Sequence, residues 1–496
     1  MGKFILAIDQ GTTGTTVCLV NKKGQIVDKH NQEFPQIFPK PGWVEHNLDD
    51  IWNSVVEGID SLMNKTNTSS KDIICIGITN QRETVGIWEK GSSKPLHNAI
   101  VWQCRRTTDV CTKLKKQGHG RTVKNKTGLV LDPYFSGTKL GWLFKQDKTW
   151  KQKARDGKVA AGTIDTFLVW KLTGGKSHVT DVSNASRTML MNIKKGTWDP
   201  ELLKLLKVPK ECLPEIKASN AQFGVTRSVP GLEDGIPITG ILGDQQAALF
   251  GQTCFKAGDA KCTFGTGSFI LMNTGDQPLK SKAGVLTTIA WKLENQKKMS
   301  YALEGGAFVC GAAVQWLRDG LEFITKSSEV ETLARSCEDT QGVEFVPALA
   351  GLGAPHWAPE ARGMICGLTR GTTRAHIARA TLEAMALQNV EILQAMEKDL
   401  GKKMKQLRVD GGATANDLLM QLQSDYLGQK TYRPETIETT VAGAAYMAGL
   451  GAGVWESLEE IKHVSKVEKE FSPQSTPKQR KDRLNRWKLA VRRTTL

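Results

Sequence analysis

The chain opens with two apolar segments separated by a turn that is rich in glycine and threonine. Residues 4–8 and residues 17–20 are apolar runs of the kind that favours strands. The turn between them, residues 9–16, holds one carboxylate, two glycines and four threonines. Such a turn offers backbone N–H groups, hydroxyl groups and a charge that attracts metal ions. It predicts a hairpin that holds phosphate, with an ordinary threonine-rich hairpin as the alternative.

A second turn of similar composition lies in the other half of the chain. Residues 260–264 and 269–272 are predicted strands, and Gly265-Thr266-Gly267-Ser268 separates them. Shortly before this turn, Asp244 lies between the apolar run 236–242 and an alanine-rich segment. A carboxylate at the start of a helix is stabilised by the free N–H groups there, so Asp244 is either a functional side chain or only a helix cap.

A third strand-to-helix turn follows near the C-terminus. Residues 407–409 are a predicted short strand that ends at Asp410-Gly411-Gly412-Ala413, and Asn416 begins an amphipathic run that stops at Gly428. Glycines at such a turn let the backbone approach a ligand closely, here an adenine and a ribose. A tight turn without a ligand is the commoner case, but three similar turns in one chain favour a nucleotide site.

Two familiar nucleotide motifs are missing from the sequence. Residues 173–177 imitate the end of a P-loop, but Trp170 stands where that motif needs glycine. No Gly-x-Gly-x-x-Gly pattern follows the first strand, so a dinucleotide-binding fold is not supported.

Composition limits the class of protein further. The 496 residues are 40% apolar, enough for several cores, and no apolar run approaches ~18 residues. We therefore expect a cytoplasmic protein without membrane insertion. The ten cysteines form no Cys-x-x-Cys pair and no cluster with histidine, which predicts reduced, buried thiols rather than a zinc site.

The net charge of +16 raises the possibility of a nucleic-acid partner. Half of this excess lies in residues 462–496, which carry eleven Lys or Arg against three Asp or Glu. A helix is predicted over 478–493, with Leu484, Trp487 and Val491 forming one apolar stripe. We expect this stripe to pack on the body and the charges to face solvent, and we expect no nucleic-acid partner.

The pattern of elements predicts two α/β domains of related plan that face each other across a cleft. We place them at residues 1–240 and 241–460, followed by a basic helical tail at 461–496. In the first, the apolar run 73–79 is interrupted by Asn80-Gln81-Arg82-Glu83, and 99–102 is another strand. Adjacent opposite charges are costly when buried unpaired, so Arg82 and Glu83 should meet water, each other or a polar ligand.

A helix is predicted over residues 375–400, capped by Thr373 and stopped by Gly401.

Several longer segments match one known family. The chain resembles the FGGY carbohydrate kinases, within the sugar kinase, Hsp70 and actin superfamily, from about residue 4 to 470. The segments that carry the resemblance are residues 9–13, 41–46, 77–84, 132–139, 187–190, 243–251, 315–319 and 408–413.

The resemblance implies a fold of two actin-like (ribonuclease H-like) ATPase domains that flank a central catalytic cleft. The first domain would bind a polyol and part of the phosphate chain, and the second would bind the nucleotide. Among the family, the sequence is most similar to members that phosphorylate glycerol. The implied activity is the ATP-dependent conversion of glycerol to sn-glycerol 3-phosphate, with Mg²⁺ as the metal ion.

The resemblance also implies a role for individual residues. Asp244 would be the general base, and Asp9 and Asp244 would lie near magnesium. The expected glycerol-binding residues are Arg82, Glu83, Trp102, Tyr134, Asp244, Gln245 and Phe269. The expected ATP-binding residues are Thr12, Thr13, Gly14, Thr266, Gly311, Gln315, Gly412 and Asn416.

Two departures from the common family pattern stand out. Gly14-Thr15-Thr16 replaces a Ser-Ser-Arg sequence, so backbone N–H groups or a lysine must do what that arginine does for phosphate charge. The loop 230–235 lacks the Gly-Gly-Thr-Arg stretch linked to sugar-bisphosphate regulation, so we expect no feedback by that ligand.

Two other functions remain open at this level. A kinase for a larger sugar or polyol would share these motifs, although Trp102, Phe269 and the Arg82-Glu83 pair favour a small triol. An actin-like or Hsp70-like switch would share the phosphate turns, but it would need neither Tyr134 nor a carboxylate aimed at an acceptor hydroxyl. Relatives are commonly dimers or tetramers, so we expect a homodimer or homotetramer that binds glycerol and ATP.

Overall fold

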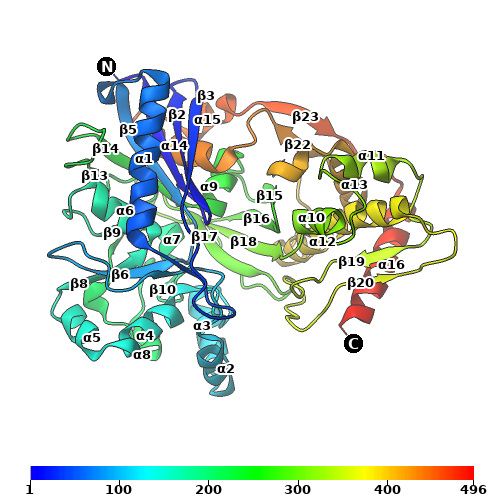
Figure 1. Cartoon of the computed structure of the whole chain (residues 1–496), viewed down its shortest axis with the longest axis horizontal. Coiled ribbons are helices and arrows are strands. Elements are labelled where there is room, and N and C mark those ends of the chain that lie inside the picture. The colour runs from blue at the N-terminus through cyan, green and yellow to red at the C-terminus, as the bar shows by residue number, and fades with distance from the viewer. Residues whose placement is uncertain (1, 496) are drawn as a thin grey trace.

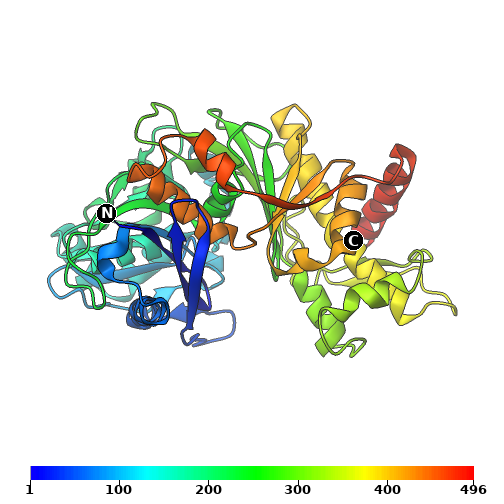
Figure 2. The ribbon, with the colours of Figure 1, turned by 90° about the horizontal axis from the view of Figure 1, so that it is seen from above.

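The computed structural model describes residues 2–495 and has two lobes, each built around one large β-sheet (Figure 1). The first lobe holds the N-terminal strands and the second holds most of the C-terminal half, including the last helix. Figure 2 shows the two lobes side by side from above.

The first sheet has six strands in the order β13-β14-β5-β1-β2-β3. Strands β1 and β2 form the predicted antiparallel hairpin, and β5 runs parallel to both β1 and β14. Buried apolar residues line these central strands because both faces of the sheet are covered. The strands are β1 (Phe4–Gln10), β2 (Gly14–Asn21), β3 (Ile26–Glu33), β5 (Ile73–Asn80), β13 (Gly224–Val225) and β14 (Pro237–Gly243).

The second sheet repeats this plan in seven strands, in the order β17-β18-β16-β15-β21-β22-β23. Its hairpin β15-β16 corresponds to β1-β2, and β21 runs parallel to β15 as β5 does to β1. The predicted α/β fold with two related halves is therefore confirmed. The strands are β15 (Ala260–Phe264), β16 (Ser268–Gly275), β17 (Leu286–Trp291), β18 (Ser300–Ala307), β21 (Leu407–Asp410), β22 (Thr431–Pro434) and β23 (Val467–Phe471).

Two helices, α9 (Asp244–Gly251) and α14 (Thr439–Gly451), pack against each other at the junction of the lobes. Helix α14 comes from the second half of the sequence but lies on β1, β5 and β14 of the first sheet (Figure 1). The approach is close because glycines face the helix. A Cβ on Gly77 would lie 2.4 Å from the Ala444 carbonyl oxygen, and one on Gly240 would lie 2.3 Å from the Ala448 nitrogen.

The rest of the first lobe consists of a small four-stranded sheet, β4-β7-β6-β8, and surrounding helices. The small-sheet strands are β4 (Glu45–His46), β6 (Val85–Glu89), β7 (Ala99–Ile100) and β8 (Val159–Thr163). Other strands are β9 (Val179–Asp181), β10 (Met191–Asn192), β11 (Thr197–Trp198) and β12 (Glu215–Lys217). The helices are α1 (Leu48–Thr66), α2 (Thr108–Lys116), α3 (Gly120–Thr127), α4 (Ser136–Gln146), α5 (Lys148–Arg155), α6 (Ile164–Leu172), α7 (Val182–Ala185) and α8 (Pro200–Leu206).

Helices of the second lobe begin and end close to the predicted positions. Helix α12 starts at Arg374 after a capping box on Thr373, and it ends at Leu400, followed by Gly401 with a positive φ. Asn416 caps α13 by accepting a hydrogen bond from the Leu419 N–H group. The elements are α10 (Gly311–Asp319), α11 (Glu329–Arg335), β19 (Glu344–Val346), β20 (Met364–Cys366), α12 (Arg374–Leu400), α13 (Asp417–Leu427) and α16 (Pro477–Thr494). Helix α15 (Leu458–Val464) packs instead on the first lobe, where Ile461 joins the apolar cluster of Ile5 and Val20.

The predicted strand 99–102 is shorter in the structure. Only β7 (Ala99–Ile100) pairs with its neighbours, because the chain turns away after Ile100. This turn frees the side chain of Trp102 from the sheet.

The predicted helical tail, residues 461–496, is only partly helical. Residues 467–471 form β23 of the second sheet, and helix α16 packs on the second lobe at its outer edge (Figure 2). Trp487 and Val491 of the predicted stripe are buried, and Leu484 is partly buried against the same cluster. One charge departs from the expected exposed face: Arg483 is buried between Glu344 and Glu383.

All ten cysteines are free thiols, and eight of them are buried. Among the helices of residues 2–495, none combines the length and the apolar character that crossing a bilayer requires.

Candidate active site

Each of the two glycine-rich hairpin turns is closed by a backbone hydrogen bond between two of its glycines. The Gly11 N–H group donates to the Gly14 carbonyl, and the Gly265 N–H group donates to the Gly267 carbonyl, each at 2.9 Å. Thr13 and Thr266, near the tips of the turns, are exposed to solvent. Both turns therefore present backbone and hydroxyl groups from their own lobe, as a phosphate site requires.

Asp244 is the first residue of helix α9, directly after β14. Gly243 occupies the cap position, and the Asp244 carboxylate accepts a hydrogen bond from the Gln245 N–H group at 2.7 Å. The side chain of Asp244 is 31% exposed, whereas the Arg82 side chain beside it is 2% exposed. This difference leaves one edge of the Asp244 carboxylate free to meet a ligand.

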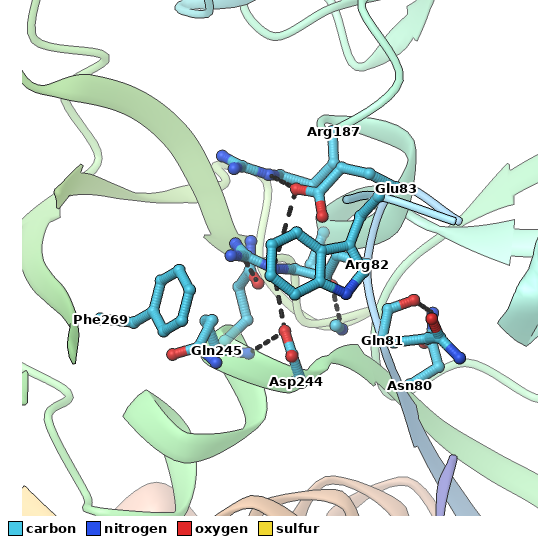
Figure 3. Close-up of polar contacts among 12 residues, drawn as sticks. Asn80, Gln81, Arg82, Glu83, Arg187, Asp244, Gln245 and Phe269 are labelled. Atoms are coloured by element: carbon cyan, nitrogen blue, oxygen red, sulfur yellow. Dashed lines mark hydrogen bonds and ion pairs between the residues drawn. The ribbon is translucent and has the colours of Figure 1, made fainter. Parts of the chain in front are cut away.

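Arg82 and Glu83 lie where the first lobe's main sheet ends and the small sheet begins. Arg82 Nε lies 2.9 Å from Asp244 Oδ1 (Figure 3). Arg82 Nη2 lies 3.5 Å from the Tyr134 hydroxyl. Glu83 adopts a φ of 62°, in the left-handed region that is strained for a residue with a side chain. This backbone conformation lets two successive charged side chains point into the protein.

Three aromatic rings form one side of the same space. The Trp102 ring centroid lies 5.6 Å from that of Tyr134 and 6.5 Å from that of Phe269. Phe269 comes from β16 of the second lobe, whereas the other two come from the first. Figure 3 shows Phe269 facing the group formed by Arg82, Asp244 and Gln245. The structure thus brings the predicted polyol-binding residues of both lobes together around one exposed carboxylate.

Of the predicted ATP-binding residues, Thr12, Thr13 and Gly14 lie in the first turn, and the others lie on the second lobe. Helix α10 begins at Gly311, whose N–H group donates to the Gly265 carbonyl at 2.9 Å, so the helix is attached to the second turn. Gln315 and Gly412 are exposed, and a Cβ on Gly412 would meet no atom within 4 Å. Asn416 caps the helix that follows. These residues form a surface beside the phosphate turn, with open space at Gly412.

Asp9 lies near two other carboxylates. Burial raises the pKa of Asp9 to about 8, and the charges of Asp244 and Glu438 add to the rise. A hard cation with oxygen ligands would relieve this repulsion. No group of three or more metal-binding side chains gathers within residues 2–495. The donors therefore fit Mg²⁺ held by one or two carboxylates with the remaining ligands from phosphate and water.

The missing arginine after Thr13 has no direct substitute in the turn. Thr15 is buried with its hydroxyl bonded to Ser54, and Thr16 donates to Asn31. Lys261, at the base of the second turn, is fully buried and directs its amine to Gln245 Oε1, Thr263 Oγ1 and the Phe269 carbonyl. The turns therefore offer phosphate their backbone N–H groups and the exposed hydroxyl groups of Thr13 and Thr266.

Three charged residues next to the site were not singled out individually from the sequence. Glu304 on β18 pairs with Arg82 and with Arg187, and Lys261 donates to Gln245. Arg187 lies in one of the family segments, but nothing in that segment alone assigns it a contact. A signal for Glu304 was present, since a lone carboxylate in the apolar run 301–304 must find a partner when buried.

Comparisons with known proteins agree with this geometry. The models of the N-terminal and C-terminal domains of the "FGGY family of carbohydrate kinases" match residues 4–251 and 260–452. A glycerol kinase of Bdellovibrio bacteriovorus is 64% identical over 99% of both chains, and one of Myxococcus xanthus is 54% identical over 99% of both. The crystal structure of Plasmodium falciparum glycerol kinase with ADP matches with a TM-score of 0.94 and 39% identity, covering 99% of this chain and 98% of that one.

Proposed function

The chain belongs to the FGGY family of carbohydrate kinases, and from this premise we infer that it transfers the γ-phosphoryl group of ATP to glycerol, forming sn-glycerol 3-phosphate. Full-length similarity to glycerol kinases at 54–64% identity supports this activity. The observation that carries it is the position of Asp244, which joins Arg82 within a ring of aromatic side chains from both lobes.

We propose that the pocket between Arg82 and Phe269 binds glycerol. A triol needs several polar partners for its hydroxyl groups and an apolar surface for its C–H face. Arg82, Glu83, Gln245 and the Tyr134 hydroxyl supply the first. The rings of Trp102, Tyr134 and Phe269 supply the second.

Asp244 is the proposed general base. A terminal hydroxyl group of glycerol would donate its hydrogen bond to the exposed carboxylate edge, and the proton would pass to Asp244 as the oxygen attacks phosphorus. Arg82 Nε lies 2.9 Å from Oδ1 of that carboxylate, and this ion pair favours the orientation that the mechanism needs. General-base catalysis contributes roughly 10²–10⁴ in rate, and positioning of the two substrates supplies much of the rest.

The two hairpin turns and the second lobe are proposed to hold ATP. Thr12, Thr13 and Gly14 on one side and Thr266 on the other would contact the phosphates. Asp9 and Asp244 would hold Mg²⁺, directly or through water, and the ion would neutralise charge on the phosphoryl oxygens. The nucleoside would lie along the surface formed by Gly311, Gln315, Gly412 and Asn416. The proposed assembly is a homodimer or homotetramer.

A substrate comparison tests the function. Purified protein is assayed for ADP release with ATP and Mg²⁺ plus glycerol, erythritol, xylulose or gluconate, and glycerol 3-phosphate is measured by a coupled dehydrogenase. We expect turnover with glycerol to exceed that with every other acceptor. A higher kcat/KM with another acceptor than with glycerol would identify that acceptor as the substrate. ADP release that does not depend on an acceptor would indicate a nucleotide switch instead.

A further inference from the structure

Glu304 belongs to the second lobe, but its carboxylate lies between two guanidinium groups of the first. It accepts hydrogen bonds from Arg82 Nη1 at 2.7 Å and Arg82 Nη2 at 3.0 Å, which makes this contact bidentate. The same carboxylate accepts from Arg187 Nη2 at 2.9 Å. Three of the hydrogen bonds that hold the arginine pair therefore come from one side chain across the lobe junction.

Glu304 remains ionised in this position. Burial alone would raise its pKa, but the attraction of Arg187 and Arg82 outweighs burial and lowers the pKa to about 2. Its side chain is 4% exposed, so water screens these interactions little. Bidentate pairing of arginine with carboxylate fixes the plane of the guanidinium group as well as its position.

The contacts of Arg82 divide between two tasks: its terminal nitrogens make hydrogen bonds and its Nε makes an ion pair. Both terminal nitrogens bond to Glu304, whereas Nε faces Asp244 Oδ1. The stem of Arg82 is confined as well, since a Cβ on Gly243 would lie 2.7 Å from Arg82 Cδ. The orientation of Arg82 toward Asp244 thus depends on the position of Glu304.

Glu304 is also joined to the phosphate turn of its own lobe. In the β16-β18 ladder, Glu304 pairs with Leu271, and two positions further along Gly306 pairs with Phe269. The end of β18 lies against the turn, where a Cβ on Gly267 would be 2.7 Å from the Ala307 carbonyl oxygen. One short strand therefore links the second phosphate turn, the Phe269 ring and the Glu304 carboxylate.

We infer that Glu304 is a positioning residue for glycerol phosphorylation: it orients Arg82 toward Asp244 and so makes the glycerol site depend on the second lobe. This inference rests on the proposed function. Glu304 touches neither substrate, and its effect passes through Arg82. Loss of its charge should weaken glycerol binding while the nucleotide surface at Gly311 and Gly412 stays intact.

The test compares Glu304→Gln with Glu304→Asp and a matched control. Glu344→Gln is the control, because Glu344 is also a buried carboxylate of the second lobe paired with a buried arginine, Arg483. KM for glycerol, KM for ATP, kcat and the melting temperature are measured for each. Glu304→Gln should raise KM for glycerol roughly 10-fold or more, the effect of losing charged hydrogen bonds, with KM for ATP within about twofold of the parent.

The remaining variants separate positioning from general destabilisation. Glu304→Asp keeps the charge on a shorter side chain, so its KM for glycerol should lie between that of the parent and that of Glu304→Gln. Glu344→Gln should lower the melting temperature without changing KM for glycerol. An unchanged KM for glycerol in both Glu304 variants would overturn the inference, as would parallel rises in both KM values. If Glu304→Gln is insoluble, the inference is judged from Glu304→Asp alone, by whether KM for glycerol rises while KM for ATP does not. Failure of the parent protein to phosphorylate glycerol would overturn the proposed function itself.

Discussion

The indole Nε1 of Trp102 donates a hydrogen bond to the Thr12 hydroxyl over 3.0 Å. The Trp102 backbone N–H group donates to Thr84 Oγ1 at 3.2 Å, which fixes the same residue from behind. One aromatic side of the proposed glycerol pocket is thereby attached to the first phosphate turn. The proposed sites for the two substrates share a side-chain contact before either substrate binds.

Trp102→Phe should keep the apolar surface and lose this link. A single neutral hydrogen bond is worth about 1 kcal/mol, so we expect kcat/KM for glycerol to fall roughly fivefold. Trp198→Phe is the matched control, because Trp198 donates its Nε1 hydrogen bond to the Pro214 carbonyl in another part of the first lobe. Steady-state kinetics that show equal effects of the two changes would argue against a role for the Thr12 contact.

Asp244→Asn should abolish most phosphorylation while nucleotide binding persists. The amide cannot accept the glycerol proton, so kcat should fall by about 10²–10⁴. ADP affinity, measured by calorimetry without Mg²⁺, should change little. Asp234→Asn, at an exposed position, is the control with the same change of charge. Retention of about half of the activity in Asp244→Asn would require a different base.

Gly412→Ala tests the proposed nucleoside surface. The added methyl group meets no protein atom within 4 Å, so the free protein should keep its melting temperature. It would occupy space that we assign to the nucleoside, so the dissociation constant for ADP should rise about 10-fold. Gly120→Ala, also in open space but on the first lobe, should leave ADP binding unchanged. Unchanged ADP affinity in Gly412→Ala would show that the nucleoside does not bind at Gly412.

His46 should make stability depend on pH. Burial lowers the pKa of His46 from 6.5 to about 4, so the unfolded chain binds this proton more readily than the folded chain. The stabilisation is present above pH 6.5 and is lost as the pH falls toward 4, a total of about 3 kcal/mol. The melting temperature of the parent should therefore fall more between pH 7 and 5 than that of His46→Gln. Exposed His463→Gln should behave like the parent.

Arg483→Met should destabilise the second lobe. Arg483 pairs with Glu344 and Glu383, and all three side chains are buried. Without the guanidinium group, the two buried carboxylates lose their shared ion-pair partner. This loss lowers the free energy of unfolding by about 3–5 kcal/mol. The urea concentration at half-unfolding should drop clearly, whereas the exposed Arg492→Ala, with the same loss of charge, should change it little. Equal effects would mean that the tail helix contributes no buried ion pair.

The sequence predicted the parts of the fold that depend on local signals. The hairpin turns, the strand before Asp244 and the ends of α12 and α13 at Gly401 and Gly428 follow from turn and cap residues close by in the chain. The charged cluster does not follow from such signals. Arg82 and Glu304 are 222 positions apart, and their contact depends on how two sheets meet. The roles of the individual site residues stay predictions.

The same limit explains why Lys261 and Arg187 were not assigned a contact. Each lies in a strand or turn that is explained locally without it, and its partner comes from another part of the chain. Arg82, Tyr134 and Asp244 could be named because the family resemblance supplied their roles. The structure adds that the first and the third are in direct contact.

Helix α14 gives the molecule a seam in which backbone meets backbone, with Gly77 and Gly240 on one side and the helix on the other. A methyl group on Gly77 or Gly240 would clash with the backbone of α14, so a substitution at either glycine requires a matching change in the helix. A fragment that ends at residue 240 would lack the helix that covers its sheet. Recombining this chain with a relative should succeed only when α14 and the strands beneath it are inherited together.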